Sequence, residues 1–342
     1  MTVLTLERET RATTLTNGAL SPSRNWLISP AFDLFMVANV AWPLFLLLQF
    51  RDDFVGRAGL QFWQVYFVTT PHRWITLALV FLDRERFRQR RWLFVGILIC
   101  AIAVCTTVRL TTGALTCLLT IDYIWNAWHF AAQHQGIYRI YGRMAEAVPT
   151  QLVVIERWSL RLFLLYVTLR VAVATWSSES RDSIFVALDW LVSVIPLVLV
   201  GRDLFRCSSI ARGGLVYLAS VGSLYLSLLW AVHFRRPGLV LALTTASALF
   251  HAVEYLAVVS WSIRKRTRGP TASRDLLGIA AAQWFISLGT FLVVLGSGAW
   301  LLDQQWAEAW LFLNVIVAFL HYAFDGLIWR HRPPQTHAIA AN

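Results

Sequence analysis

WLFVGILICAIAVCTTVRL, at residues 92–110, is the stretch that decides the fold, because Arg109 near its end is its only charged residue. An α-helix needs about 20 predominantly apolar residues to cross the roughly 30 Å hydrocarbon core of a bilayer. The residues directly before it, DRERFRQRR at 83–91, are mostly charged. An apolar block beside a short charged connection predicts a membrane-spanning helix that begins at a polar loop.

The same pattern recurs along the whole chain. Hydrophobic residues make up 57% of the sequence and charged residues only 14%, whereas soluble domains carry roughly 25% charged residues. The sequence therefore excludes an ordinary soluble domain and predicts an all-α fold, a polytopic integral membrane helical bundle of about ten transmembrane helices. These helices are expected at residues 30–50, 60–82, 92–110, 112–138, 154–176, 184–200, 213–233, 238–262, 276–298 and 307–330.

Positive charge in the connections predicts how the helices are oriented. Arginine and lysine gather after every second helix, at residues 84–91, 139–157, 202–212, 264–268 and 330–332. Because cytoplasmic loops carry the excess of Lys and Arg, both termini are expected in the cytoplasm. The same placement accounts for the net charge of +11, so the expected partner is the lipid bilayer and no nucleic acid is expected.

The expected domain organisation is a single membrane domain with a tail at each end. Residues 1–28 form a polar cytoplasmic tail, 29–331 a transmembrane helical domain and 332–342 a second cytoplasmic tail. The first tail lacks the apolar region of a signal peptide, and the expected location is the bacterial inner (cytoplasmic) membrane. The four cysteines form neither a CxxC pair nor a zinc-like spacing, so no redox or metal role is expected of them.

Five of the eight histidines fall inside predicted helices, at His72, His129, His134, His251 and His321. Ionisable residues within a membrane are costly, usually face the bundle interior and mark functional sites. All of them except His134 lie about 9–13 residues before the first basic residue on the cytoplasmic side, which is roughly 14–20 Å of helix. Four helices therefore present one imidazole each at a similar depth, and imidazole is the commonest side-chain metal ligand. His134 lies nearer the cytoplasm and is expected to be a fifth ligand or to support the other four.

Four polar side chains accompany these histidines at the i+3, i+4 and i+7 spacings of one helix face. A metal-bound histidine generally donates its second N–H to a carboxylate or a carbonyl. These side chains are therefore expected to orient the imidazoles or to transfer protons. They are Asp122, Gln133, Glu254 and Asp325.

The type of ligand predicts the metal and its chemistry. Imidazoles supported by carboxylates, without thiolates, suit iron, copper or zinc. Non-haem iron is the expected cofactor, for O₂-dependent oxidation of a hydrophobic small molecule, while copper, zinc and haem stay open. Zinc would instead activate a water molecule for hydrolysis. Aromatic residues near the histidines are expected to line a pocket for the lipophilic substrate, and they are Trp125, Trp128, Tyr255, Tyr322 and Phe324.

Four short segments carry a resemblance to a known family. They are PHRW at 71–74, WHFAAQH at 128–134, HAVEY at 251–255 and HYAFD at 321–325. They resemble membrane β-carotene dioxygenases of the Brp/Blh type, which are polytopic bacterial non-haem iron enzymes. The resemblance implies that one histidine from each segment (His72, His129, His251 and His321) holds a single iron, and that an apolar tunnel delivers a carotenoid. The sequence departs from the family after His72, where Arg-Trp-Ile-Thr stands in place of the family's Gly-x-x-Asp.

Two other classes of function remain open from the sequence. Two of the histidines could ligate a haem in a membrane electron-transfer protein. His, Asp and Glu side chains near the middle of the membrane are also what proton-coupled transporters use. Carriers are often built from two matching halves with Gly- or Pro-broken helices, and no such match is evident here.

A second group of charged residues is expected to be structural. Arg170 and Asp189 fall toward the outer half of two consecutive predicted helices, and we expect them to form an ion pair. His233 stands at the outer end of its helix, next but one to Arg235, and is expected at the membrane interface.

Overall fold

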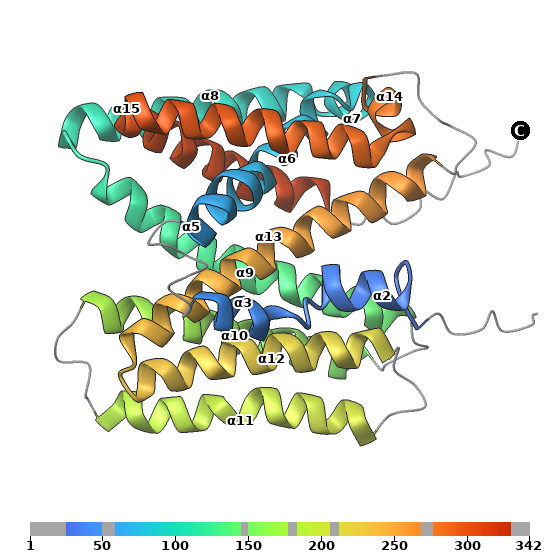
Figure 1. Cartoon of the computed structure of the whole chain (residues 1–342), viewed down its shortest axis with the longest axis vertical. Helices are drawn as coiled ribbons and strands as arrows, with labels where there is room; N and C mark the ends of the chain where they lie inside the picture. The colour runs from blue at the N-terminus through green and yellow to red at the C-terminus, as the bar shows by residue number, and fades with distance from the viewer. Residues whose placement is uncertain are drawn as a thin grey trace, which may run out of the picture.

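The computed structural model describes residues 25–49, 59–144, 150–176, 183–205, 212–267 and 276–329. Every regular element within these ranges is helical, so the prediction of an all-α fold is confirmed for them. Figure 1 shows the long helices packed side by side, with α8 (Arg91–Thr112) and α15 (Trp284–Ile328) on one side of the bundle and α11 (Ser183–Phe205) on the opposite side. Much of the chain predicted as polar tails, at 1–24 and 332–342, lies outside the described residues.

The remaining elements follow one another along the chain with short connections. The N-terminal part contains two π-helices, η1 and η3, each next to a short α-helix. The elements are α2 (Pro30–Phe32), η1 (Asp33–Val37), α3 (Trp42–Gln49), α5 (Gly59–Gln64), η3 (Val65–Thr69), α6 (Thr70–Phe81), α7 (Arg84–Gln89), α9 (Thr116–Met144), α10 (Thr150–Trp176), α12 (Arg212–His233), α13 (Pro237–Thr267) and α14 (Leu276–Ala282).

Among the described residues, six helices are long and apolar enough to cross a membrane, which fits an integral membrane protein. A bent pair, Pro30–Val37 with Trp42–Gln49, could add a seventh span. Helix α9 is not among the six, because the polar side chains from Asp122 to His134 lower its mean hydropathy. The six are Arg91–Thr112, Trp158–Thr175, Ile184–Phe205, Arg212–His233, Pro237–Ile263 and Trp284–Ile328.

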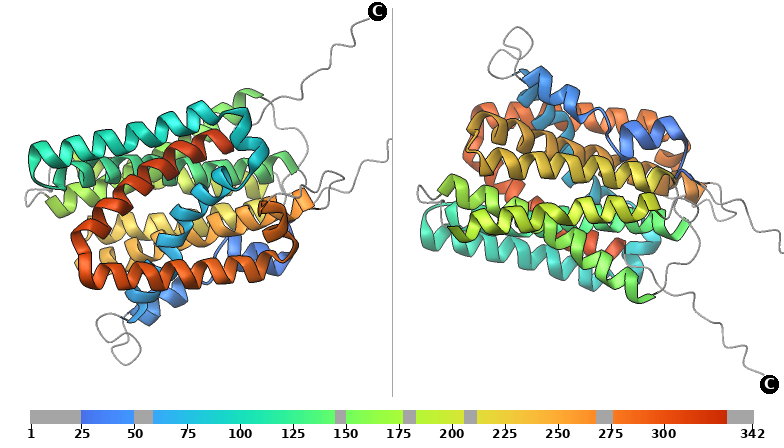
Figure 2. Two further views of the ribbon diagram at one scale, coloured as in Figure 1. Left: turned by 90° about the horizontal axis from the view of Figure 1, so that it is seen from above. Right: turned by 90° about the horizontal axis from the view of Figure 1, so that it is seen from below.

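Helix α15 is folded back on itself. Its 45 residues would extend about 68 Å as a straight helix, roughly twice the hydrocarbon core of a bilayer. Trp306 breaks it with non-helical dihedrals, φ −137° and ψ 55°. Figure 2 shows the two halves running side by side in opposite directions. This turn falls in the gap between the last two predicted helices, at 276–298 and 307–330.

Two glycines occupy positions that disfavour a larger side chain, one because of its backbone conformation and one because of a close contact. Gly113 ends α8 in the left-handed conformation, φ 66°, and its N–H bonds to the carbonyl of Arg109, as glycine does at many helix ends. Gly296 lies where the first half of α15 presses on η3. A Cβ atom at Gly296 would come within 2.6 Å of the Phe67 ring and 2.8 Å of the Tyr66 carbonyl oxygen.

Two large groups of buried apolar side chains lie on either side of the bundle, and α9 contributes to both. One group includes Phe163, Tyr217 and Leu224. It contains side chains from η1 and from the five helices α9, α10, α11, α12 and α13. The other includes Phe94 and Phe324 and joins α6, α8 and α9 to the second half of α15. The four helices that carry the predicted ligand histidines (α6, α9, α13 and α15) therefore meet where these two groups adjoin.

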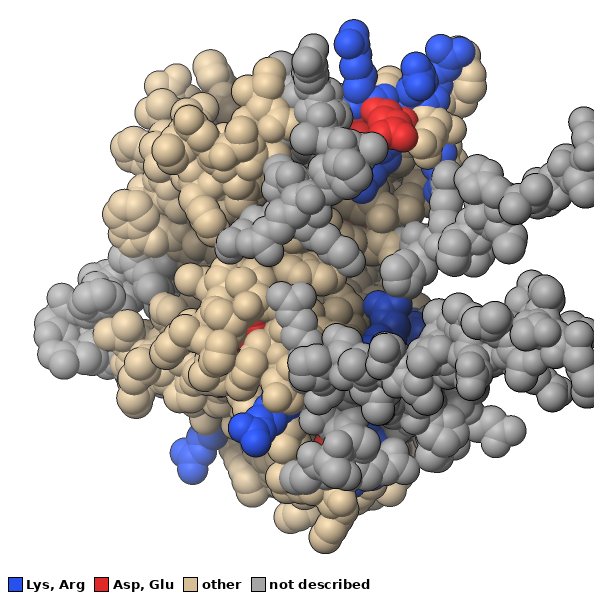
Figure 3. All heavy atoms as spheres, turned by 90° about the vertical axis from the view of Figure 1, so that its right-hand side faces the viewer, with Lys and Arg blue, Asp and Glu red and all other residues tan. Residues whose placement is uncertain are grey.

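The basic connection between α6 and α8 lies at one end of the bundle, together with α14 (Figure 1). Figure 3 faces this end and shows Lys and Arg side chains gathered at its upper margin, with acidic side chains beside them. Within α7, Arg84 and Arg88 are exposed. Several charged loop residues used to predict the orientation lie outside the described residues, at 206, 268 and 330–332.

Candidate metal centre

The local sequence around His72 distorts the helix that carries it. Pro71 has no backbone N–H, so the Phe67 carbonyl four residues earlier cannot receive the usual helical hydrogen bond. The chain widens there into the π-helix η3, in which the Thr70 N–H bonds to the Val65 carbonyl. Such π-helical segments inside α-helices frequently accompany functional sites. Regular α-helix resumes at α6, with His72 buried in its first turn.

The four histidines at similar predicted depth lie together in the bundle, and we call them the histidine cluster: His72, His129, His251 and His321. The ring centroids are 5.1 Å apart for His72 and His321, and 5.3 Å for His72 and His251. His129 lies 4.7 Å from His321 and 5.0 Å from His251. Nitrogen atoms of His72, His251 and His321 all lie within 4.8 Å of one another. An ion held at about 2.0–2.1 Å keeps its ligand nitrogens roughly 3–4 Å apart, so the rings need to close by only about 1 Å.

The histidine cluster contains ring nitrogens that the described protein atoms do not satisfy. His251 is fully buried, and neither of its ring nitrogens has a hydrogen-bond partner among the described residues. Nδ1 of His72 is also buried without one. Leaving a buried polar group unpaired costs about 1–3 kcal/mol, and native proteins rarely leave such groups unexplained. A metal ion that accepts the lone pairs fits both the orphaned nitrogens and the type of ligand.

Hydrogen bonds around His321 determine which of its nitrogens faces the cluster. Tyr255 donates its hydroxyl proton to Asp325, with 2.9 Å between the oxygens. The Tyr255 oxygen then accepts from Thr76 at 2.7 Å, and the Thr76 oxygen accepts from Nδ1 of His321 at 2.7 Å. This order places the proton of His321 on Nδ1 and leaves a lone pair on Nε2. Nε2 of His321 lies 3.1 Å from Nε2 of His129, at the inner side of the cluster.

Two predicted supporting carboxylates lie on the His129 side of the cluster. Asp325 approaches His129 with 4.0 Å between Oδ2 and Nδ1, longer than a hydrogen bond. Asp122 accepts a hydrogen bond from the Tyr322 hydroxyl at 2.9 Å, and the Tyr322 ring lies 5.0 Å from that of His129. Both carboxylates therefore act on the imidazoles through tyrosines, Asp325 through Tyr255 and Asp122 through Tyr322.

His134 lies beside the histidine cluster, with its ring centroid 6.2 Å from that of His251, and its nitrogens belong to a second buried network. Its Nδ1 lies 2.9 Å from the Tyr217 hydroxyl and 3.0 Å from a Glu254 oxygen, and its Nε2 lies 3.3 Å from the Tyr225 hydroxyl. Gln133 donates to Glu254 at 2.9 Å and to the backbone oxygen of His251 at 3.1 Å. The nitrogens of His134 are thus engaged by Glu254 and two tyrosines, and its two expected roles, as a fifth ligand or as support for the other four, stay predictions. Glu254 orients His134 and not an imidazole of the cluster.

The aromatic residues predicted to line a substrate pocket lie in different surroundings. Tyr255 and Tyr322 contact the histidine cluster directly. Trp125 and Trp128 are partly exposed on α9. Phe324 is fully buried among apolar side chains, with its ring edge-on to those of Phe81 and Phe94. A shared substrate pocket for all five stays a prediction.

The structure gives three further side chains, Thr76, Phe130 and Tyr217, a defined place in the site. Thr76 links His321 to Tyr255, and its position four residues after His72, on the same face of α6, is a signal that could have found it. Phe130 stacks on His251, with ring centroids 3.8 Å apart and planes 18° apart, and so fixes that imidazole. Tyr217 joins His134 to Glu254 from α12, and its spacing carries no sign of this.

The chain was compared with known protein families, curated proteins and solved structures. No family model matches the chain, and no curated protein or solved structure matches it.

Proposed function

We propose that this protein is a membrane metalloenzyme in which His72, His129, His251 and His321 hold a non-haem metal ion, with iron as the first candidate. The observation that carries the proposal is His251, which is fully buried with both ring nitrogens lacking a partner among the described residues. Three other imidazoles surround it on three other helices. A neutral imidazole in that position is costly unless a lone pair is bound.

The proposal includes the membrane arrangement expected from the sequence. The chain crosses the membrane about ten times, with α5 to α6, α9 and the two halves of α15 counted as spans, and both termini lie in the cytoplasm. In this arrangement the histidine cluster lies within the bilayer, consistent with a bacterial inner membrane location. A substrate would reach it from the lipid phase.

The geometry favours a single non-haem ion over a haem. Two axial ligands on opposite faces of a haem iron stand about 4 Å apart, twice the metal–nitrogen distance of about 2.0–2.1 Å. The closest pair here, Nε2 of His129 and Nε2 of His321, is 3.1 Å apart. The rings of His72 and His251 lie 5.1 Å and 5.0 Å from those of His321 and His129, respectively, in the space that the flat porphyrin of a haem would occupy.

Imidazole-bound iron would supply O₂ activation for the oxidation of a lipophilic substrate. The resemblance of four segments to Brp/Blh-type carotenoid dioxygenases supports this reaction class. The residues of this chain provide the positioning: Thr76 and Tyr255 hold the proton of His321 on Nδ1, and Asp325 anchors that hydrogen-bonded series. Partners of this kind typically change metal affinity by about 10–100-fold when they are removed.

Elemental analysis and a UV–visible spectrum of detergent-purified protein test the proposal. We expect about one metal ion per chain, as iron, with no Soret band, and loss of that metal in His321→Ala and in His129→Ala with expression retained. His233→Ala is the matched control, because His233 is a partly buried histidine that bonds to Asp189 outside the cluster. A Soret band would identify a haem protein. Absence of metal and chromophore after reconstitution would end the proposal and leave proton-coupled transport to be tested.

A further inference from the structure

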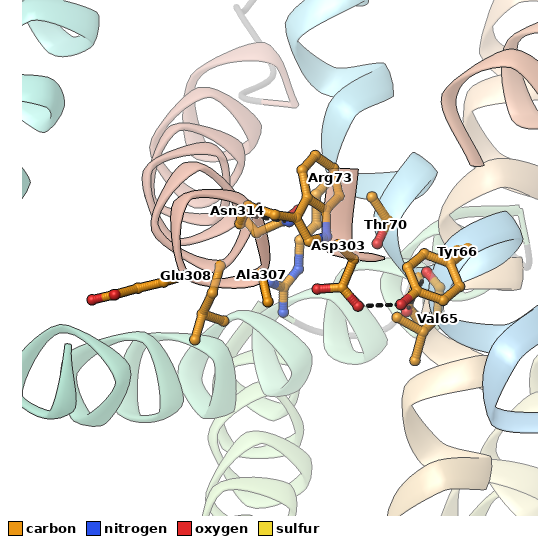
Figure 4. A pocket seen from close by; sticks show the side chains of 11 residues that line it. Val65, Tyr66, Thr70, Arg73, Asp303, Ala307, Glu308 and Asn314 are labelled. Atoms are coloured by element: carbon orange, nitrogen blue, oxygen red, sulfur yellow. Dashed lines mark hydrogen bonds between the residues drawn. The ribbon is translucent and has the colours of Figure 1, made fainter. Parts of the chain in front are cut away.

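A cavity of about 480 Å³ lies beside α6, between η3 and α15. Apolar side chains form much of its wall, and it also exposes hydroxyl, amide and charged groups (Figure 4). Its volume falls in the range of roughly 300–1,000 Å³ that is typical of small-molecule sites. Its lining residues include Val65, Arg73, Asp303, Glu308, Trp310 and Leu311.

Arg73 lines this cavity, and Asp122 acts on its guanidinium only electrostatically, without direct contact. No hydrogen bond or ion pair of its guanidinium occurs within the part of the chain that the structure describes. The two carboxylates of the lining are engaged elsewhere. Asp303 accepts a hydrogen bond from Tyr66, and Glu308 pairs with Arg109 on α8. Figure 4 shows the Glu308 side chain directed away from Arg73, and one Asp303 oxygen bonded to Tyr66 while the other lies on the side of Arg73.

The surroundings of Arg73 define what would neutralise it. A charged side chain within a membrane is costly unless it is paired, and a guanidinium binds a carboxylate through two parallel hydrogen bonds. Asp303 and Glu308 lie on the same rim and would repel a doubly charged phosphate more strongly than a singly charged carboxylate. Trp310, Leu311 and Val65 offer an apolar wall to a hydrocarbon chain.

Arg73 also lies close to the histidine cluster. It directly follows His72 in α6, and Asp122 and Tyr322, which stand beside His129, interact with it electrostatically. From the guanidinium without a hydrogen bond among the described residues, the apolar wall and this proximity, we infer that the cavity binds the carboxylate of a long-chain amphiphile, with Arg73 as its anchor. This inference rests on the proposed function in taking that amphiphile as the substrate class of the metal site. It separates the protein from enzymes of wholly hydrocarbon substrates such as carotenes.

Binding of tritiated oleate to the full-length protein in nanodiscs, read by scintillation proximity, tests the inference. Unlabelled oleate should displace the label, whereas oleyl alcohol, with the same chain and no charge, should compete at least 10-fold more weakly. Arg73→Gln should weaken oleate binding roughly 10- to 100-fold, as expected for the loss of a charge-assisted hydrogen bond. Arg73→Lys, which keeps the charge, should recover part of the affinity.

Matched controls keep a failure to fold apart from a failure to bind. Arg91→Gln removes an exposed arginine on α8 away from the cavity and should bind oleate normally. The metal content of each variant is measured in parallel. Equal competition by oleyl alcohol, or unchanged binding in Arg73→Gln, would overturn the inference even if the protein holds its metal. Stronger competition by a phosphatidate than by oleate would overturn the carboxylate assignment. Arg73-dependent oleate binding by a protein that holds no metal would keep the site and remove the proposed enzyme.

Discussion

Two buried polar groups in this bundle contrast in how their hydrogen-bonding capacity is met. The Asp189 cluster consists of Tyr166, Arg170, Asp189 and His233. Oδ1 of Asp189 accepts from Tyr166 at 2.6 Å and from Nε of Arg170 at 3.3 Å, while Oδ2 lies 3.0 Å from Nδ1 of His233. Both oxygens of the carboxylate therefore have protein partners. All four rings of the histidine cluster are buried, whereas Tyr166 and His233 are only partly buried, yet both nitrogens of His251 and one of His72 lack partners among the described residues.

The contrast separates structural from functional burial. Buried charges in the Asp189 cluster are offset by protein groups, and breaking such a pair is costly because it leaves an uncompensated charge. Unpaired imidazoles in the histidine cluster do not stabilise the protein on their own, because each is desolvated without compensation. Their position within one small space supports the proposal of a bound metal ion.

The largest effect is expected from replacing the least satisfied side chain, in His251→Phe. Metal retention should be lost completely, because one of the clustered imidazoles is removed. The metal-free variant should be as stable as metal-free wild type, or more stable by about 1–3 kcal/mol, because two unpaired buried nitrogens disappear. Unfolding in an SDS titration, with elemental analysis, measures both quantities.

The same substitution at His134 is the matched control for His251→Phe. His134 is fully buried but bonded to Glu254, Tyr217 and Tyr225. His134→Phe should therefore destabilise the protein by about 1–3 kcal/mol and leave the metal bound. If His251→Phe destabilised the metal-free protein as much as His134→Phe, the contrast between satisfied and unsatisfied groups would be lost.

A second prediction tests the other side of the comparison, in Asp189→Ala. Removing the carboxylate leaves Arg170 and His233 without their shared anion, so the free energy of unfolding should fall by about 3–5 kcal/mol. The same SDS titration measures the change, and Asp189→Asn, which keeps an acceptor for Tyr166, should lose less. The metal content of the folded fraction should not change. A loss of metal in Asp189→Ala would mean that the two clusters are coupled.

The smallest effect is expected from Thr76→Val, which keeps the shape of the side chain but removes the hydroxyl between His321 and Tyr255. Without that acceptor the proton of His321 is no longer held on Nδ1, and metal affinity should fall about 10–100-fold. Chelator competition measures the apparent affinity. Thr76→Ser retains the hydroxyl and should bind metal like wild type, so equal losses in the two variants would point to packing and not to the hydrogen bond.

Much of the site could be predicted from helical spacing. Counting residues to the basic loops placed His72, His129, His251 and His321 at one level, and the structure brings them together. The ion pair of Arg170 with Asp189 was predicted in the same way and is confirmed.

Spacing failed where rotation of one helix against another decides the contact. Glu254 follows His251 by three residues, yet it points to His134 on α9 and not to the cluster. Thr76 was missed because its role depends on a tyrosine from α13 and a histidine from α15, two separate helices.

The sequence by itself determined the helical class, the membrane-compatible length of the apolar blocks and the shared depth of four imidazoles, because these depend on composition and on the fixed rise of a helix. Tertiary structure alone decided that the four helices are neighbours, and that Arg73 faces a cavity without a hydrogen bond or ion pair from the described residues. The physical reason is that the order and rotation of packed helices follow from side-chain fit between elements distant in sequence, such as Gly296 against Phe67.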